Sequence, residues 1–160
     1  MLKQNKVINI YKRALHFVEL FFSNIIMKIR VAVNGFGRIG RVFLRSVLKH
    51  NNIEVVAIND LSSSEIMSHL FKYDSVHRTF EGEVHYTSNS IVIDDKSIYY
   101  SSISEPEKLP WKDLKVDVVL ECTGNFKSKK LALKHIKSGA NKVIISAPSS
   151  DSDIKTIVMG

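Results

Sequence analysis

The run Ile29–Arg41, which reads IRVAVNGFGRIGR, constrains the fold of this chain more than any other segment. A β-type apolar run leads into three glycines, Gly35, Gly37 and Gly40, spaced as G-x-G-x-x-G. Glycines in this pattern permit a tight turn, a close approach of phosphate to the backbone, and close packing of the next helix on the sheet. The free N–H groups and positive dipole end of that helix favour phosphate groups. The segment therefore predicts a dinucleotide-binding turn.

An acidic residue after the next β-type run supports this interpretation. Asp60 lies twenty positions after Gly40 and follows the apolar run Ile53–Ile58. A carboxylate at this place accepts hydrogen bonds from the adenosine ribose and repels a 2′-phosphate, so we expect NAD rather than NADP. A lone glycine motif also occurs in structural turns, but here strand, glycines, helix, second strand and acid follow in order.

The composition fits one globular domain. The chain has 160 residues, of which 44% are hydrophobic, enough to fill a core. Cys122 is its only cysteine, which excludes an intrachain disulfide framework and favours a reducing, cytoplasmic location. The formal net charge of +7 is spread along the sequence without dense Lys/Arg clusters, so we expect no nucleic-acid partner. No His/Cys cluster has metal-ligand spacing, so we expect no metal site.

Residues 1–26 do not resemble the sequence that follows them. Their apolar run, Ala14–Phe22, is interrupted by a histidine and a glutamate and is too short to span a bilayer. Four interpretations stay open: a membrane-surface helix, a targeting segment, an extra packed helix, or upstream sequence before a start at Met27. The last is favoured, because a compact domain begins naturally at the first strand. We therefore expect an N-terminal extension, 1–26, outside the fold and a dinucleotide-binding domain at 27–160, with no membrane partner.

Strand-like and helix-like segments alternate from Met27 onward. This alternation predicts an α/β fold: a Rossmann-type doubly wound, mostly parallel sheet with helices on both faces. Short central strands and a turn at Asp94-Asp95-Lys96 predict a small antiparallel excursion. The predicted helices are Arg38–His50, a segment capped within Ser62–Ser64 that ends near Lys72, and Lys129–Lys137 with a glycine C-cap at Gly139. Glu105–Trp111 is predicted as a turn or short helix. The predicted strands are Ile29–Asn34, Ile53–Ile58, Val84–Tyr86, Ile91–Ile93, Ser97–Ser101, Val116–Glu121, Lys142–Ser146 and Ile154–Val158.

Five segments resemble the NAD-binding half of phosphorylating glyceraldehyde-3-phosphate dehydrogenase. VNGFGRIGR at 33–41, AIND at 57–60, KYDSVH at 72–77, ECTG at 121–124 and SGANKVIISAPS at 138–149 occur in that family's order and spacing. The resemblance covers only the family's N-terminal half, and it implies NAD as cofactor in a cytoplasmic, glycolytic enzyme. It departs at Arg78-Thr79-Phe80, where the family usually has Gly-Arg-Phe or Gly-Lys-Phe, in a loop away from the chemistry.

The resemblance also implies cofactor contacts at individual residues. It places Asn34 and Phe36 on the adenosine side of the first turn, and it places Ser146 near the nicotinamide ribose. Ser104 falls beside the adenine, where members often have a basic residue, so its role is open. The full expected set is Asn34, Gly35, Phe36, Gly37, Arg38, Ile39, Gly40, Asp60, Ser104, Thr123, Gly124, Phe126 and Ser146.

Ordinary structural roles compete with several of these assignments. Thr123 and Ser146 are hydroxyl residues at strand ends, where they often act as caps. Phe36 can fill the core, and Asp60 can cap a helix or turn. The shared order of the segments favours the cofactor-binding interpretation over these alternatives.

The family's reaction needs groups that the matched segments do not supply. In that reaction a thiolate attacks glyceraldehyde 3-phosphate, hydride passes to NAD⁺, and phosphate releases an acyl phosphate. The family's cysteine lies in an S-C-T-T-N segment after the position of Ile154–Val158, and the sequence given ends at Gly160. Cys122 is a poor substitute, because burial and the neighbouring Glu121 both raise the pKa of a thiol. We therefore assign no catalytic residue in this chain.

These observations lead us to expect a truncated NAD-binding portion of an enzyme that is a homotetramer in the family. Two other classes stay open: a non-catalytic NAD-binding interaction module that pairs with another chain, and a degraded gene fragment. A semialdehyde dehydrogenase is a further alternative, but the sequences of the segments KYDSVH and ECTG argue against it.

We predict that the purified chain alone does not oxidise glyceraldehyde 3-phosphate, because hydride transfer requires an aldehyde bound to a nucleophilic thiolate. Absorbance of NADH, followed with and without inorganic phosphate, measures this. Phosphate-dependent NADH production by the pure chain would contradict the prediction.

Overall fold

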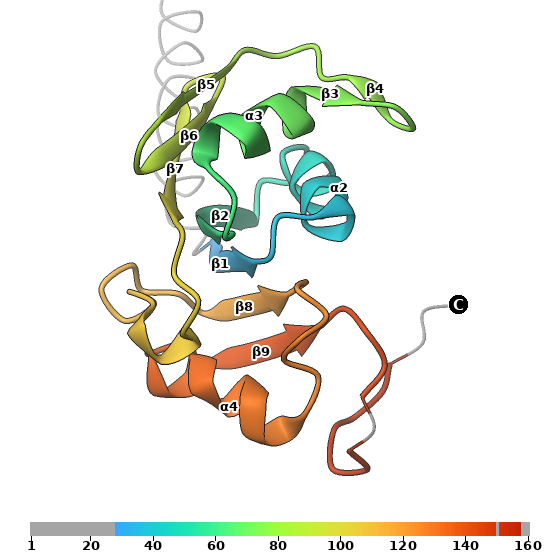
Figure 1. Cartoon of the computed structure of the whole chain (residues 1–160), viewed down its shortest axis with the longest axis vertical. Helices are drawn as coiled ribbons and strands as arrows, with labels where there is room; N and C mark the ends of the chain where they lie inside the picture. Colours follow the sequence, from blue (N-terminus) through green and yellow to red (C-terminus); the bar gives the residue numbers. More distant parts are fainter. Residues whose placement is uncertain (1–27, 150, 158–160) are drawn as a thin grey trace, which may run out of the picture.

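The computed structural model describes residues 28–149 and 151–157, and it shows a β-sheet with helices on both faces (Figure 1). The predicted extension, 1–26, lies outside the described residues. The helices are α2 (Arg38–Val47), α3 (Ser64–Lys72), α4 (Lys129–Lys137) and the 3₁₀ turn η1 (Pro106–Lys108); the strands are β1 (Ile29–Asn34), β2 (Ile53–Asn59), β3 (Tyr73–Asp74), β4 (Arg78–Thr79), β5 (Val84–Thr87), β6 (Ser90–Ile93), β7 (Lys96–Ser101), β8 (Val118–Glu121) and β9 (Lys142–Ile145).

The main sheet has seven strands in the order β5-β6-β7-β2-β1-β8-β9. Strands β7, β2, β1, β8 and β9 are parallel to one another, and β5 and β6 extend β7 as an antiparallel meander. This topology confirms the predicted mostly parallel α/β fold with its antiparallel excursion. The chain leaves β1 toward β2 and β7, then returns to β8 on the other side of β1. Such a reversal opens a crevice at the carboxyl ends of the two strands that flank it.

Two hydrophobic clusters fill the two faces of the sheet. One cluster includes Val33 of β1 with Leu44 of α2 and Phe71 of α3. The other includes Ala32 of β1 and Trp111, whose indole nitrogen donates to a histidine of α4. Neighbouring residues of β1 therefore point into different cores, as alternation along a strand requires. Helices α2 and α3 cover one face and α4 covers the other, which confirms the doubly wound arrangement.

A β-bulge in β2 changes which way the end of this strand points. Val31 pairs with Val55, but Ala32 pairs with Ala57, so β2 carries one extra residue at this place. Val56 and Ala57 consequently lie in the same cluster, and strict alternation resumes one residue later. With unbroken alternation Asn59 would face α2 and α3; the bulge turns it to the α4 side instead.

Local signals read from the sequence are confirmed at the helix ends and at the hairpin. The hydroxyl of Ser63 accepts a hydrogen bond from the Ile66 N–H at 3.3 Å and caps α3. Gly139 follows α4 with a φ of 111°, a conformation that suits glycine. Asp94 has a φ of 53° in the tight turn between β6 and β7.

The structure ends α2 earlier and begins β8 later than the sequence predicts. The Lys49 and His50 N–H groups bond to Ser46 and Val47, so a tight turn ends α2 at Val47. Lys115 has a φ of 51°, and the Val116 N–H donates to the Trp111 carbonyl at 2.9 Å. A turn therefore occupies the place where the predicted strand begins.

Two further segments differ from the prediction. The loop expected at Arg78-Thr79-Phe80 begins with strand β4, which pairs with β3 in a small hairpin. In the turn of this hairpin, Asp74 Oδ1 accepts the N–H groups of His77 and Val76 at 2.7 and 2.8 Å. These bonds lower the pKa of Asp74 to about 2. The predicted strand Ile154–Val158 is wrong for residues 154–157, which adopt turn and irregular structure. A short β-type run becomes a strand only beside a hydrogen-bonded neighbour, and among the described residues this run pairs with no strand, although β9 is the edge strand of the sheet. Val158 lies outside the described residues.

Over the ranges 28–149 and 151–157, no helix has both the length and the apolar character needed to cross a bilayer.

Candidate functional site

A cleft of about 320 Å³ opens at the carboxyl ends of the central parallel strands. Its walls are the chain segments that follow β1, β2, β7 and β8, so the cleft occupies the crevice that the strand order creates. Five of its lining residues, Asn59, Leu61, Ile103, Cys122 and Asn125, were not predicted as site residues. The predicted residues that line it are Asn34, Gly35, Gly37, Asp60, Ser104, Thr123 and Phe126.

The three glycines of the first turn have different surroundings. Gly35 has a φ of +89°, and a Cβ there would lie 2.7 Å from the Thr123 nitrogen. At Gly40 a Cβ would lie 2.5 Å from the Gly35 carbonyl oxygen, so close packing of α2 excludes a side chain. Gly37 has an ordinary φ of −67°, and no described atom lies within 4 Å of the place of a Cβ. The fold itself therefore does not require glycine at 37, and the free space lies in the cleft.

The start of α2 is open beside this space. Gly37 occupies the N-cap position, where it supplies no side-chain acceptor, and the first turn of the helix contains no acidic residue. Arg38 and Ile39, which follow it, are exposed. The first N–H groups of a helix have no partner within it, so this helix start offers donors and a positive dipole end to an anion.

Asp60 connects two walls of the cleft. Its Oδ2 accepts the Phe36 N–H at 2.8 Å, and its Oδ1 accepts the Ser62 N–H at 3.0 Å. Tyr100 steadies the same loop through its hydroxyl, which donates to the Ser62 carbonyl at 2.8 Å. Each carboxylate oxygen can accept a second bond. Asp60 thus caps a turn, one of the two predicted alternatives, and also presents acceptors to the cleft that it lines.

Other predicted residues lie outside the lining. The Phe36 ring is fully buried and stacks on Phe71 at a centroid distance of 6.0 Å, so core filling describes this side chain. Gly124 has a φ of +75° and open space around it. Ser146 is exposed at the end of β9, where its N–H donates to the Glu121 carbonyl at 2.9 Å, and it lines a separate groove between α4 and β9.

Cys122 lines the cleft but is unsuited to act as a nucleophile. Burial raises the pKa of its thiol, a hydrogen bond with Ser146 opposes the rise, and the Glu121 carboxylate adds to it. This agrees with the structural role expected from the sequence. In the part of the chain that the structure describes, no group of three or more His, Cys, Asp or Glu side chains is placed to hold a metal ion.

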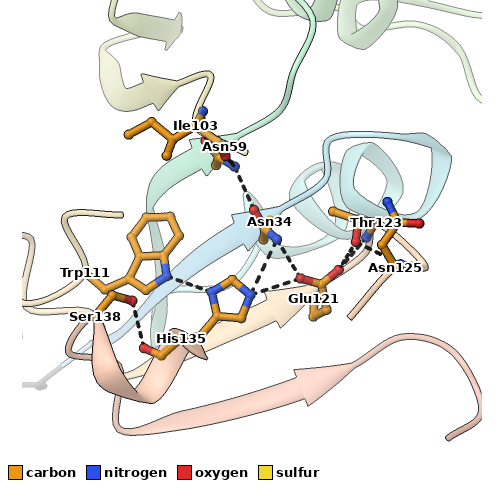
Figure 2. Close-up of polar contacts among 9 residues, drawn as sticks. All are labelled: Asn34, Asn59, Ile103, Trp111, Glu121, Thr123, Asn125, His135 and Ser138. Atoms are coloured by element: carbon orange, nitrogen blue, oxygen red, sulfur yellow. Dashed lines mark hydrogen bonds and ion pairs between the residues drawn. The ribbon is translucent and has the colours of Figure 1, made fainter. Parts of the chain in front are cut away.

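A buried carboxylate, that of Glu121, is bonded to the cleft-lining residues Asn34 and Thr123; Figure 2 shows these contacts. Glu121 is 1% exposed, and its Oε2 accepts from Asn34 Nδ2 at 2.6 Å and from His135 Nε2 at 3.1 Å. Its Oε1 accepts from the Thr123 N–H at 2.7 Å and from the Thr123 hydroxyl. Burial alone would raise the pKa of Glu121, but these hydrogen bonds outweigh it and hold the pKa below its usual value.

The hydrogen bonds continue from this carboxylate across the sheet. Asn59 Nδ2 donates to Asn34 Oδ1 at 2.8 Å and to the Ile103 carbonyl at 2.9 Å. Asn59 Oδ1 accepts from Ser101 Oγ and from the Ile103 N–H, both at 2.9 Å. We call Glu121, Asn34, Asn59 and Ser101 the polar row. They are the last residues of β8, β1, β2 and β7, and each precedes a segment that lines the cleft.

Three residues of the polar row lie inside the segments VNGFGRIGR, AIND and ECTG, but of these only Asn34 was predicted as a site residue. Asn34, Asn59 and Glu121 each end an apolar strand, at the sheet edge where open α/β domains bind ligands. His135 lay in a helix that follows the glycine motif by nearly a hundred residues, and no spacing rule connects the two.

The sheet order and the crevice at its reversal place this chain among the dinucleotide-binding α/β domains. More particularly, the chain belongs to the glyceraldehyde-3-phosphate dehydrogenase family: residues 29–129 match the family model described as glyceraldehyde 3-phosphate dehydrogenase, NAD binding domain. This confirms the resemblance seen in the sequence.

Curated relatives carry the same family name. The chain is 53% identical over 133 residues to glyceraldehyde-3-phosphate dehydrogenase of Thermotoga maritima, which covers 82% of this chain and 40% of the relative. It is 50% identical over 129 residues to the Clostridium acetobutylicum protein of that name, covering 81% of the chain and 38% of the relative. It is 48% identical over 134 residues to that of Geobacillus stearothermophilus, covering 84% and 40%. The chain thus spans about two fifths of the length of these relatives.

The residues present suit NAD. The vacant Cβ place at Gly37 leaves backbone open to a pyrophosphate, the start of α2 offers unpaired N–H donors, and Asp60 offers acceptors in the same cleft. The chain is the NAD-binding domain of this family.

We predict that Glu121→Gln destabilises the fold most strongly near neutral pH. The amide N–H groups of glutamine would face the donors of Asn34 and His135, so the free energy of unfolding should fall by about 2–3 kcal/mol at pH 7. The folded pKa of Glu121 lies below its unfolded value of 4.5, so the carboxylate stabilises the fold above that value and loses this effect as the pH falls through the folded pKa. The difference in free energy of unfolding between the unaltered chain and the variant should therefore be smaller at acidic pH.

Urea unfolding at neutral and acidic pH measures this difference. Glu83→Gln is a matched control, because its side chain is 82% exposed and its loss should change little at either pH. If Glu121→Gln lowers the free energy of unfolding by the same amount at both pH values, the prediction is contradicted.

Proposed function

We propose that the cleft binds NAD⁺ with its pyrophosphate over the first glycine turn. The backbone of Gly37, Arg38 and Ile39 donates to the phosphates, and Asp60 accepts from the adenosine ribose. The single observation that carries this proposal is the free space at Gly37, which no contact within the fold explains. The proposed binding set is Asn34, Gly35, Phe36 through its backbone, Gly37, Arg38, Ile39, Gly40, Asp60, Ser104, Thr123, Gly124, Phe126 and Ser146.

The nicotinamide end of the cofactor lies, in this proposal, toward the segments after β8 and β9. Thr123 and Phe126 line the cleft on that side, and Ser146 is exposed nearby, within reach of Cys122. The domain itself comprises residues 27–160, with 1–26 outside it.

We further propose that this domain serves the oxidation of glyceraldehyde 3-phosphate to an acyl phosphate, in a cytoplasmic homotetramer. Family membership and the names of the relatives support this step. When bound, NAD⁺ supplies the hydride acceptor. The residues of this chain bind and orient it, and Cys122, with its raised pKa, leaves the thiol chemistry to other residues.

We predict that Gly37→Ala weakens NAD⁺ binding by about tenfold or more and lowers the free energy of unfolding by no more than about 1 kcal/mol. The added methyl group occupies ligand space, and the fold loses only the N-cap preference for glycine over alanine. Isothermal titration calorimetry gives the affinity, and thermal unfolding gives the stability. Gly40→Ala is the contrasting control, since its Cβ would collide with the Gly35 carbonyl and lower stability directly. Unchanged affinity in a folded Gly37→Ala chain would refute the proposed site.

We predict that Asp60→Asn narrows the preference for NAD⁺ over NADP⁺ by about tenfold, because it removes the charge that repels a 2′-phosphate. The ratio of the two affinities, measured by the same titration, is the decisive quantity. A general loosening of the loop would weaken both cofactors equally and leave the ratio unchanged, and that result would count against this role of Asp60.

A further inference from the structure

Among the described residues, His135 is the most buried titratable side chain that the proposed site does not use. It projects from α4, is 0% exposed, and does not line the cleft. Its ring lies between Trp111 and Glu121 (Figure 2). The Phe126 ring packs against it in a T-shaped arrangement, with the two ring centroids 6.0 Å apart. A histidine in this position is enclosed by groups that restrict where its proton can be.

The hydrogen bonds of His135 define its tautomer. Trp111 Nε1 lies 3.0 Å from His135 Nδ1, and an indole N–H only donates. Nδ1 therefore accepts and carries no proton. The ring is neutral, its proton is on Nε2, and Nε2 donates to Glu121 Oε2 at 3.1 Å.

This tautomer holds the Glu121 carboxylate in one orientation. Because Oε2 is bonded to His135 and Asn34, Oε1 faces the backbone N–H and the hydroxyl of Thr123, a residue that lines the cleft. In the opposite tautomer an Nε2 lone pair would face the carboxylate, and the carboxylate would have to turn. Turning it would release Thr123 and Asn34, and both residues line the cleft.

We propose that His135 is a positioning residue of the NAD⁺ site: its Nε2–H, fixed by Trp111, orients Glu121, which holds Thr123 and Asn34 at the cleft. The inference rests on the proposed function, since it takes this cleft as the NAD⁺ site. It gives α4 a role in a site that no residue of α4 lines.

Two substitutions of His135 separate positioning from packing. The amide of glutamine extends to about the place of Nε2, so His135→Gln keeps a donor toward Glu121. The amide of asparagine extends only to about the place of Nδ1, so His135→Asn keeps a partner for Trp111 and loses the donor. We expect His135→Asn to bind NAD⁺ about tenfold more weakly than the unaltered chain, and His135→Gln to stay within about threefold of it. Equal losses of affinity in the two variants would overturn the proposal.

Two NMR measurements test the same point without NAD⁺. Long-range ¹H–¹⁵N spectra of the unaltered chain should show the His135 proton on Nε2, and a proton on Nδ1 would overturn the proposal. The Thr123 amide should exchange with solvent faster in His135→Asn than in His135→Gln, and equal rates would also overturn it. Trp111→Phe removes the donor to Nδ1, so it should give a mixture of tautomers and faster Thr123 exchange. This variant decides the matter if the His135 variants do not fold.

These readouts distinguish failure of the inference from failure of the proposed function. If Gly37→Ala weakens NAD⁺ binding and His135→Asn does not, the site stands and the positioning role falls. If the unaltered chain binds no NAD⁺, the proposed site falls, and the tautomer and the Thr123 exchange rates still support or overturn the positioning.

Discussion

A buried carboxylate without a lysine or arginine partner among the described residues lies at the carboxyl end of β8. Among the described residues, Glu121 is bonded by an asparagine, a neutral histidine and both donors of a threonine, and by no lysine or arginine. Desolvation of such a charge is costly unless its acceptor sites are filled, so the surrounding donors cannot vary independently. The positions of the first glycine turn and of the segment after β8 both follow from this requirement.

Hydrogen bonds of this kind replace hydrocarbon packing at the floor of the cleft. Dispersion contacts tolerate small shifts, whereas hydrogen bonds weaken steeply with misalignment. Asn59 and Asn34 each use both ends of their amides, so neither can flip without breaking bonds on two strands. The carboxyl ends of four adjacent strands are therefore held in register by side chains as well as by the backbone ladder.

The sequence predicts the architecture well because the signals for it are local. Apolar strands, the capping serine Ser63, the glycine turn and the acid at Asp60 each act within a few residues, and each is where the sequence places it. Predictions fail where the structure of a segment depends on contacts with residues far away in the sequence. Residues 154–157 have strand-like composition without a paired neighbour among the described residues. The bond between Trp111 and His135 joins segments that only the finished fold brings together.

The bulge in β2 has a consequence for how the gene for this domain can change in length. Insertions and deletions are usually absorbed in loops, because loops carry no side-chain alternation. Between Val55 and Ile58 a strand can do the same, because β2 carries one residue more than β1 over this stretch. Losing one codon there would remove the extra residue, restore a regular ladder, and leave Asn59 opposite Asn34 on the face where it bonds to Asn34 and Ile103. The bulge therefore makes this strand tolerant of a one-residue deletion directly before the cleft.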